Sequence, residues 1–378
     1  MAADVVVIGG GVIGLSVAYR LATEGVLCTV LDRGELGRQA SWAGAGLIPA
    51  QGERAGSHPP ADLRSWSASL YPEWSAALLE ETGVDNGYRR TGGVDVGLSS
   101  EEADQLRTMA GRWRAEGIVF EKLAQGDFNR VEPALGPAVT VAYFLPDRAQ
   151  VRNPRHLQAL IRSLTMRGVT LRPGRGALGF ETKEGRVTGV KTADGTLACG
   201  AIVMAAGAWS GALLGGLGVD APTPPVKGQI VLLRSERPLL KRIVEHGSHY
   251  LVPRDDGRIL VGATEEHSGF DVRPTALGVR ELLDEALMVC PRLAEAEVER
   301  AWAGLRPGSV DTRPYLGPIP GYVNAFVAAG HKRAGLQLST GTAEVIADLV
   351  LGRPPRIDPT PYRIGREPSV DSDEPFRS

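Results

Sequence analysis

The sequence has little cysteine, few aromatic residues and no excess of either charge. Its three cysteines, at positions 28, 199 and 290, lie far apart, which predicts neither a disulfide framework nor a Cys-x-x-Cys metal site. The 42 basic and 44 acidic side chains are spread without long runs of one sign. No surface for nucleic acid or for an anionic membrane is therefore predicted, and a small-molecule substrate is the default expectation.

Targeting and metal-binding signals are also missing. The apolar N-terminus has Asp4 where a signal peptide has a basic segment, and four glycines between positions 9 and 14 interrupt it. We therefore expect no signal peptide, no membrane-spanning helix and a cytosolic location. The six histidines include no pair four residues apart and no His-Glu-x-x-His motif, so no metal site is predicted.

The chain does have length, abundant glycine and a strong N-terminal pattern. Its 378 residues, 43% of them hydrophobic, are enough for two hydrophobic cores. Residues 4–8 predict a buried parallel strand, the apolar periodicity of residues 13–24 predicts a helix, and residues 27–31 predict a second buried strand. These three elements form a right-handed βαβ unit.

The turn between the first strand and the helix fits Gly-x-Gly-x-x-Gly, and Asp32 follows at the end of the second strand. In a dinucleotide site, Gly9 permits a tight turn, Gly11 lets the backbone approach the pyrophosphate, and Gly14 packs the helix on the strand. The helix N-terminus favours phosphate, and Asp32 accepts hydrogen bonds from ribose hydroxyls. A glycine turn that binds nothing is the alternative, which this context disfavours. The motif alone does not separate FAD from NAD.

The rest of the chain mixes helices with strands. Helices are predicted at residues 63–82, 101–116, 153–167, 277–289 and 342–351. Strands are predicted at residues 92–98, 139–145, 169–172, 187–192, 201–205 and 326–329, with two or three more between 226 and 263. Asn153 is predicted to be an N-cap because Pro154 follows it. The small residues at 38–50 predict a loop that approaches a partner closely.

Several later segments together resemble the D-amino-acid oxidase family of flavoproteins, and within it the glycine oxidases of thiamine biosynthesis. They are SWAGAGLIP (41–49), VMAAGAWS (203–210), PVKGQ (225–229), AWAGLRPGSVDTRPYLGPIP (301–320) and AAGHKRAGLQLSTGT (328–342). The resemblance runs from residue 5 to about residue 363. It implies an α/β fold in which a Rossmann-like FAD-binding domain is joined to a discontinuous α+β substrate domain with an antiparallel sheet.

The resemblance also implies how the chain divides. The FAD-binding domain is expected at residues 1–85, 140–218 and 306–365. The substrate-binding domain is expected at 86–139 and 219–305, and a loose tail at 366–378.

The cofactor that the resemblance implies is FAD. Besides Gly9, Gly11 and Gly14, the residues expected to contact or frame it are Val12, Ile13, Asp32, Arg33, Ala40, Ser41, Ala45, Gly46, Leu47, Ala177, Gly207, Gly330, His331, Lys332, Arg333, Ala334, Gly335, Leu336 and Gln337. The loop at 331–337 matches the loop around the isoalloxazine ring. It precedes a helix, whose N-terminal N–H groups favour negative charge on the reduced flavin.

Three side chains are expected at the substrate. By resemblance, Arg306 is the clamp for the substrate carboxylate, and a guanidinium suits this role because it binds a carboxylate through two parallel hydrogen bonds. Tyr250 matches a tyrosine whose hydroxyl reaches the same carboxylate, and Arg333 matches a second arginine nearby. The alternatives are a structural or surface arginine at 306, a tyrosine packed on a strand, and a solvated charge at 333.

The chain departs from the family pattern at two positions. Ala334 stands where many relatives have Asn or Asp, and Lys332 stands where an aromatic residue is common. Either change alters the predicted mouth of the substrate site. Residues 308–317 contain no cysteine, although the related monomeric sarcosine oxidases attach FAD through a cysteine in this part of the chain. We therefore predict FAD that is not covalently bound.

The activity that the resemblance implies is oxidation of small amino acids. Glycine comes first, then sarcosine and small D-amino acids, with an α-keto acid, ammonia or an amine, and hydrogen peroxide as products. The expected partners are the amino acid and dioxygen, with no nucleic acid and no membrane, while a homo-oligomer stays open. The alternatives are a dehydrogenase that passes electrons to a quinone or carrier, and an FAD-binding assembly protein without turnover.

Overall fold

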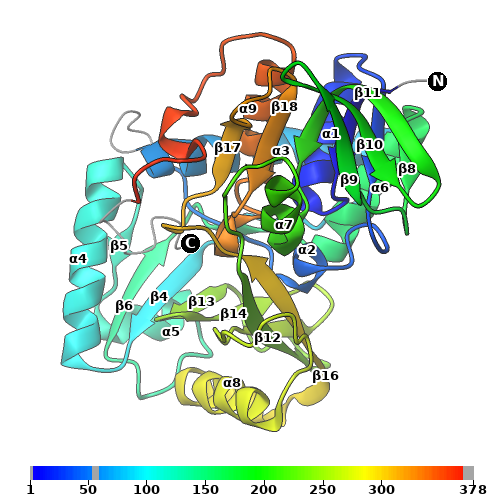
Figure 1. Cartoon of the computed structure of the whole chain (residues 1–378). Coiled ribbons are helices and arrows are strands. Elements are labelled where there is room, and N and C mark those ends of the chain that lie inside the picture. The colour runs from blue at the N-terminus through cyan, green and yellow to red at the C-terminus, as the bar shows by residue number, and fades with distance from the viewer. Residues whose placement is uncertain (1–2, 53–58, 369–378) are drawn as a thin grey trace.

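The computed structural model describes residues 3–52 and 59–368, and two large β-sheets dominate it. Figure 1 shows one sheet in the upper half of the molecule and the other in the lower half. The first runs in the order β17 (Tyr315–Pro318), β18 (Ala325–Ala329), β11 (Gly195–Met204), β1 (Ala3–Ile8), β2 (Cys28–Leu31) and β8 (Thr170–Arg172), and β10 (Arg186–Thr192) and β9 (Gly179–Lys183) extend it from β11.

Most of the second sheet falls in the segments expected for the substrate domain. It runs in the order β16 (Glu297–Pro307), β12 (Pro225–Arg234), β15 (Arg258–Gly262), β14 (His249–Pro253), β13 (Ile243–His246), β4 (Gly93–Gly97), β6 (Val141–Leu145) and β5 (Glu121–Lys122). A small third sheet pairs β3 (Leu47–Ile48) with β7 (Ala149–Gln150).

The helices lie around these sheets. They are α1 (Val12–Thr23), α2 (Ala40–Ala43), α3 (Pro59–Thr82), α4 (Ser100–Glu116), α5 (Phe128–Val131), α6 (Asn153–Met166), α7 (Ser210–Gly215), α8 (Ala276–Val289) and α9 (Ser339–Val350). Short 3-10 turns are η1 (Gln125–Asp127), η2 (Gly207–Trp209), η3 (Pro291–Glu295), η4 (Lys332–Ala334) and η5 (Thr360–Tyr362).

The predicted βαβ unit is confirmed at the centre of the first sheet. Strand β1 pairs in parallel with β2 on one side and with β11 on the other. Its residues from Val5 to Ile8 are buried, which explains their continuous apolar sequence. Helix α1 packs its apolar side chains on this sheet together with those of α9, and the two helices share one hydrophobic core.

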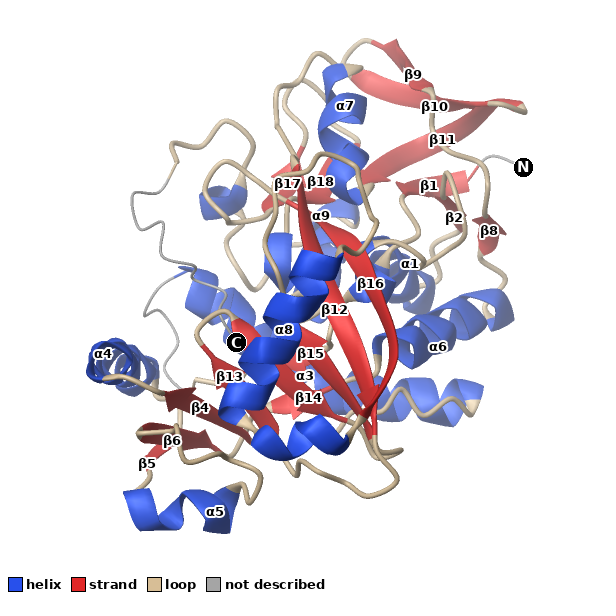
Figure 2. Ribbon diagram, turned by 90° about the horizontal axis from the view of Figure 1, so that it is seen from below, coloured by secondary structure: helices blue, strands red, loops and turns tan. Residues whose placement is uncertain are grey.

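The second sheet has more strands than the sequence predicted. Four strands, β12 to β15, lie between residues 225 and 262, where two or three were expected. Strand β16 was not predicted, because Leu305 is its only buried residue and its sequence lacks the alternation of a half-buried strand. Helix α8 covers one face of this sheet, as Figure 2 shows, and Leu282 and Ala286 share a core with Val231.

Two strands of the second sheet extend across predicted domain boundaries. Strand β6 lies within the segment 140–218 that was assigned to the FAD-binding domain, yet it pairs with β4 in the second sheet. Arg306 was placed at the start of the segment 306–365, but it belongs to β16, which pairs with β12. The chain leaves the second sheet only after these two strands end, at Leu145 and at Pro307.

The predicted contact loop at 38–50 contains helix α2 and strand β3, so it is more regular than expected. Asn153 was predicted to cap helix α6, but the N-cap is Arg152, and Asn153 lies within the helix. Its Nδ2 instead donates a hydrogen bond to the carbonyl oxygen of Ser41 at 2.8 Å. The side chain of Asn153 therefore binds the small-residue segment and does not cap the helix.

The predicted loose tail begins too early. Arg366 is buried, and its guanidinium binds the carboxylate of Asp311 through Nη2–Oδ1 at 2.6 Å and Nε–Oδ2 at 3.0 Å. Arg366 is therefore bound to the rest of the fold. Residues 369–378 of the predicted tail lie outside the described residues.

A buried group of charges joins the turn between β6 and β7 to strands β4 and β13 of the second sheet. Arg148 is 1% exposed, and its Nη2 lies 3.0 Å from Oδ2 of Asp95 on β4. Its Nη1 lies 3.1 Å from Oε1 of Glu245 on β13. Burial lowers the pKa of Arg148, but the two carboxylates more than compensate and raise it, so the guanidinium stays charged. Removal of one partner would leave buried charge without compensation.

We predict that Arg148→Ala lowers the free energy of unfolding by about 3–5 kcal/mol, because Asp95 and Glu245 lose their buried counter-charge. Urea unfolding at saturating FAD measures the change. The control is Arg107→Ala, which removes an arginine from an exposed ion pair with Asp104 and should cost less than about 0.5 kcal/mol. Equal losses in the two variants would contradict the role of the buried cluster.

Candidate active site

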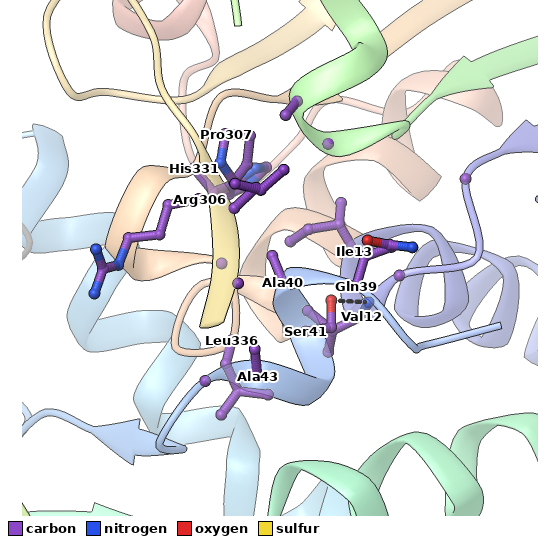
Figure 3. Close-up of a pocket in the computed structure, with 18 of the residues that line it drawn as sticks. Val12, Ile13, Gln39, Ala40, Ser41, Ala43, Arg306, Pro307, His331 and Leu336 are labelled. Atoms are coloured by element: carbon purple, nitrogen blue, oxygen red, sulfur yellow. Dashed lines mark hydrogen bonds between the residues drawn. The ribbon is translucent and has the colours of Figure 1, made fainter. Parts of the chain in front are cut away.

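A cavity of about 690 Å³ lies between the two sheets, which is a usual size for a cofactor or ligand site. Its lining comes from the βαβ turn, the small-residue segment 38–50, strands β12, β14 and β16, and the loop at 331–337. Figure 3 shows Val12 and Ile13 on the side of α1, and Arg306 on the side of β16. The predicted cofactor and substrate residues therefore face one shared space.

Glycine is required at the two positions that bring α1 to this cavity. Gly9 has φ +113°, and a Cβ there would lie 2.2 Å from the carbonyl oxygen of Ala205. A Cβ on Gly14 would lie 1.9 Å from the carbonyl oxygen of Gly9. Any larger residue would push the helix from the sheet. This is the packing that the glycine motif predicted.

Asp32 is held rigidly at the edge of the cavity. Its Oδ2 accepts a hydrogen bond from the backbone N–H of Gly10, and its Oδ1 accepts one from Gly34, both at 2.8 Å. At the start of α1, the N–H of Val12 donates to Oγ of Ser41 at 2.9 Å, the dashed line in Figure 3. The helix N-terminus, the acid and the small-residue segment form one connected wall.

Most of the predicted cofactor residues line the cavity. These are Gly9, Gly11, Val12, Ile13, Asp32, Arg33, Ala40, Ser41, Ala45, Gly46, Leu47, Ala177, Gly207, His331, Lys332, Arg333, Gly335, Leu336 and Gln337. Gly14, Gly330 and Ala334 are not part of the lining. Gly14 packs against the backbone of Gly9, Gly330 has φ +73°, and Ala334 is 1% exposed.

Two of the three predicted substrate residues, Arg306 and Tyr250, pack against glycines. Nη1 of Arg306 donates to the carbonyl oxygen of Thr264 at 3.0 Å, and a Cβ on Gly228 would lie 2.3 Å from Nη2 of Arg306. A Cβ on Gly262 would lie 2.6 Å from the ring of Tyr250. Side chains at these two glycines would displace the arginine and the tyrosine. The backbones of β12 and β15 thus form the floor on which both groups lie.

The ionisation of Tyr250 suits a hydrogen-bond donor. Burial raises its pKa, and the positive charges of Arg306 and Arg333, with a hydrogen bond to Arg306, offset only part of that effect. The phenol therefore stays neutral near neutral pH and can donate to a carboxylate. His331 also lines the cavity, and burial lowers its pKa to about 3, so its imidazole is neutral.

Arg333 lines the cavity but is also part of an ion pair that the sequence did not predict. Its Nε lies 3.0 Å from Oε2 of Glu265, and Nζ of Lys332 lies 3.2 Å from Oε1 of the same carboxylate. Glu265 follows strand β15 and belongs to no motif. Only the folded chain brings it to the loop at 331–337.

Other lining residues were also missed. Trp209 lines the cavity, and the guanidinium carbon of Arg33 lies 4.2 Å from its ring centroid. Trp209 falls in the segment VMAAGAWS, so the family motif could have indicated it. Glu245 and Ser248 also line the cavity, and no sequence signal singled them out.

Within the described residues, the lining of this cavity includes no cysteine. The described part of the chain also holds no group of three or more His, Cys, Asp or Glu side chains placed to bind a metal ion. Among its helices, none is both long and apolar enough to span a membrane. The lining instead offers a dinucleotide cradle at one end and two arginines with a tyrosine at the other.

Comparisons with known proteins agree with this geometry. The family described as "FAD dependent oxidoreductase" matches residues 4–349. The chain is 41% identical over 363 residues to a protein named glycine oxidase from Pseudomonas putida, covering 96% of this chain and 98% of that protein. It is 35% identical over 366 residues to one of that name from Geobacillus kaustophilus, covering 96% and 97%.

The fold agrees as well. The crystal structure of glycine oxidase from Geobacillus kaustophilus matches with a TM-score of 0.93 and 34% sequence identity, over 97% of this chain and 99% of that one. The structure of glycine oxidase from Bacillus cereus gives 0.90 and 30%, over 97% and 99%. The glycine cradle and Asp32 fit the cofactor that the family's description names. The chain belongs to the D-amino-acid oxidase family of FAD-dependent oxidoreductases.

Proposed function

We propose that this protein oxidises glycine, and next to it sarcosine and small D-amino acids, with FAD as cofactor and dioxygen as electron acceptor. Glycine, water and dioxygen would give glyoxylate, ammonia and hydrogen peroxide. The observation that carries the proposal is the placement of Arg306 and Tyr250 in the same cavity as the dinucleotide cradle. The names of the relatives from Pseudomonas putida and Geobacillus kaustophilus support the choice of glycine.

The proposed cofactor contacts follow from the two ends of the cavity. Gly9 and Gly11 would let the backbone reach the pyrophosphate, and Asp32 would accept from the ribose. The loop at 331–337, which leads into α9, would surround the ring system. The chemistry that bound FAD would supply is acceptance of a hydride equivalent and transfer of electrons to dioxygen. With no cysteine in the described lining, we propose that it is held without a covalent bond.

The chain's own contribution would be alignment. Arg306 would bind the substrate carboxylate bidentately, and the neutral hydroxyl of Tyr250 would donate to the same group. Both side chains are braced by backbone, through Gly228, Gly262 and the carbonyl of Thr264. A small amino acid fixed in this way keeps one orientation, and a fixed orientation removes much of the entropic cost of reaction. No protein acid or base is needed if the amine binds in its neutral form.

The first experiment is a spectrum of the purified protein, followed by glycine addition without oxygen. We expect a flavin spectrum that glycine bleaches, and in air we expect hydrogen peroxide in proportion to the glycine consumed. Bleaching without peroxide, together with dye reduction under nitrogen, would indicate a dehydrogenase. A flavin that neither glycine, sarcosine nor D-alanine bleaches would contradict the proposed function.

We predict that Arg306→Ala lowers kcat/KM for glycine at least about 30-fold, because the loss of one partner of a buried charged hydrogen bond costs about 2–5 kcal/mol. The matched control is Arg300→Ala on the same strand, where Arg300 is exposed and stacks on Trp42 and Trp302. Its kcat/KM should stay within about threefold of wild type. Wild-type activity in Arg306→Ala would refute the clamp.

We also predict that acid precipitation releases all of the flavin. Without a covalent bond, unfolding destroys the cradle at Gly9 and Asp32, so yellow colour should appear in the supernatant and a colourless protein should remain. Mass spectrometry of the pellet should give the mass of the bare chain. A pellet that keeps its flavin would show that the attachment is covalent.

A further inference from the structure

Residues 263–275 connect strand β15 to helix α8. The first part of this segment contacts both of the arginines expected at the substrate. The carbonyl of Thr264 accepts a hydrogen bond from Arg306, and the carboxylate of the next residue, Glu265, pairs with Arg333. Two consecutive residues therefore hold two guanidinium groups from different parts of the chain.

This part of the segment is firmly anchored to the second sheet. Oγ1 of Thr264 accepts from the backbone N–H of Gln229 at 3.0 Å and donates to Glu266 at 2.6 Å. Glu266 in turn lies 3.2 Å from Nζ of Lys227, whose side chain is 2% exposed. The position of Glu265 between these residues is therefore fixed by the sheet, and its side chain is directed to the loop at 331–337.

Glu265 carries a permanent negative charge beside Arg333 and Lys332, both of which line the cavity. Burial raises its pKa, but its hydrogen bond with Arg333 and the charges of Arg333 and Lys332 lower the pKa to about 2. The side chains of Glu265, Arg333 and Lys332 are 27%, 22% and 17% exposed, so solvent screens their charges only in part. Arg333 lines the same cavity as Arg306 and Tyr250, so this ion pair adjoins the space that holds the predicted carboxylate clamp.

A second carboxylate on a substrate would meet this charge. With one carboxylate bound at Arg306, a further carboxylate directed toward Arg333 must compete with Glu265 for the guanidinium and is repelled by it. A neutral substituent neither competes for the guanidinium of Arg333 nor is repelled by Glu265. We infer that Glu265 is a specificity-determining residue that disfavours substrates with a second anionic group, and this inference rests on the proposed function for its substrates.

The test compares ligands that differ in one carboxylate. Sarcosine and iminodiacetate are glycines with a methyl or a carboxymethyl group on nitrogen, and methoxyacetate and diglycolate are their oxygen analogues, which have no amine to oxidise. Turnover of the first pair gives kcat and KM. The second pair gives Kd from the shift of the flavin absorbance, so the comparison does not depend on turnover.

The variants are Glu265→Gln, Glu265→Asp and Glu236→Gln. The first removes the charge with little change of shape, and the second retains the charge. The third removes an exposed charge on the loop after β12 and serves as the control. None of these positions lies in the hydrophobic core, so we expect all three proteins to fold with a normal flavin content.

We predict that Glu265→Gln lowers the ratio of Kd for diglycolate to Kd for methoxyacetate about tenfold. This change corresponds to about 1.4 kcal/mol of relative binding free energy. The kcat/KM ratio for iminodiacetate over sarcosine should rise equally, through KM. Glu265→Asp and Glu236→Gln should keep the wild-type ratios.

Unchanged ratios in Glu265→Gln, or an equal loss for all ligands, would overturn the inference, since the second result indicates a structural role. If the wild-type flavin is not bleached by glycine or sarcosine, the proposed function fails. The Kd ratio of the two ethers then still decides whether Glu265 discriminates between one and two carboxylates.

Discussion

The small-residue segment at 38–50 is the constraint on which both halves of the site depend, because its backbone is bound from both sheets. Ser41 accepts from the N–H of Val12 and from Asn153, which lie on the side of the first sheet. Ala43 accepts from Nε1 of Trp302 at 3.1 Å, on the side of the second sheet. Gly304 would not tolerate a Cβ, which would lie 2.5 Å from Cβ of Ala43. Bulky residues here would separate the cradle from the clamp.

The parts of the fold that were predictable are those whose local sequence agrees with their tertiary setting. The β1–α1–β2 unit could be predicted because buried parallel strands are continuously apolar and the turn between them requires glycine. Strand β16 could not, because it is only half-buried and its pairing with β12 over ten positions is a long-range property. Asn153 was assigned to a cap by its neighbour Pro154, whereas its side chain binds a segment 112 residues away.

The candidate site shows the same division. Arg306 and Tyr250 were found through family motifs, and the structure places both in one cavity, but their support by Gly228 and Gly262 has no local signal. Glu265 lies 68 residues from Arg333 in sequence, so the sequence alone could not assign its charge to the site. Motifs identify groups that meet a ligand, whereas the residues that tune these groups follow from topology.

The cavity is enclosed by both sheets, and this has a consequence for folding as well as for chemistry. A molecule that fills the cavity joins the sheets and binds only the folded chain, so by mass action it adds to stability in proportion to the logarithm of its concentration. At a hundredfold excess over Kd the gain is about 2.7 kcal/mol. Flavin supply would thus set how long each new chain survives proteolysis, and cofactor and chain would mature as one unit.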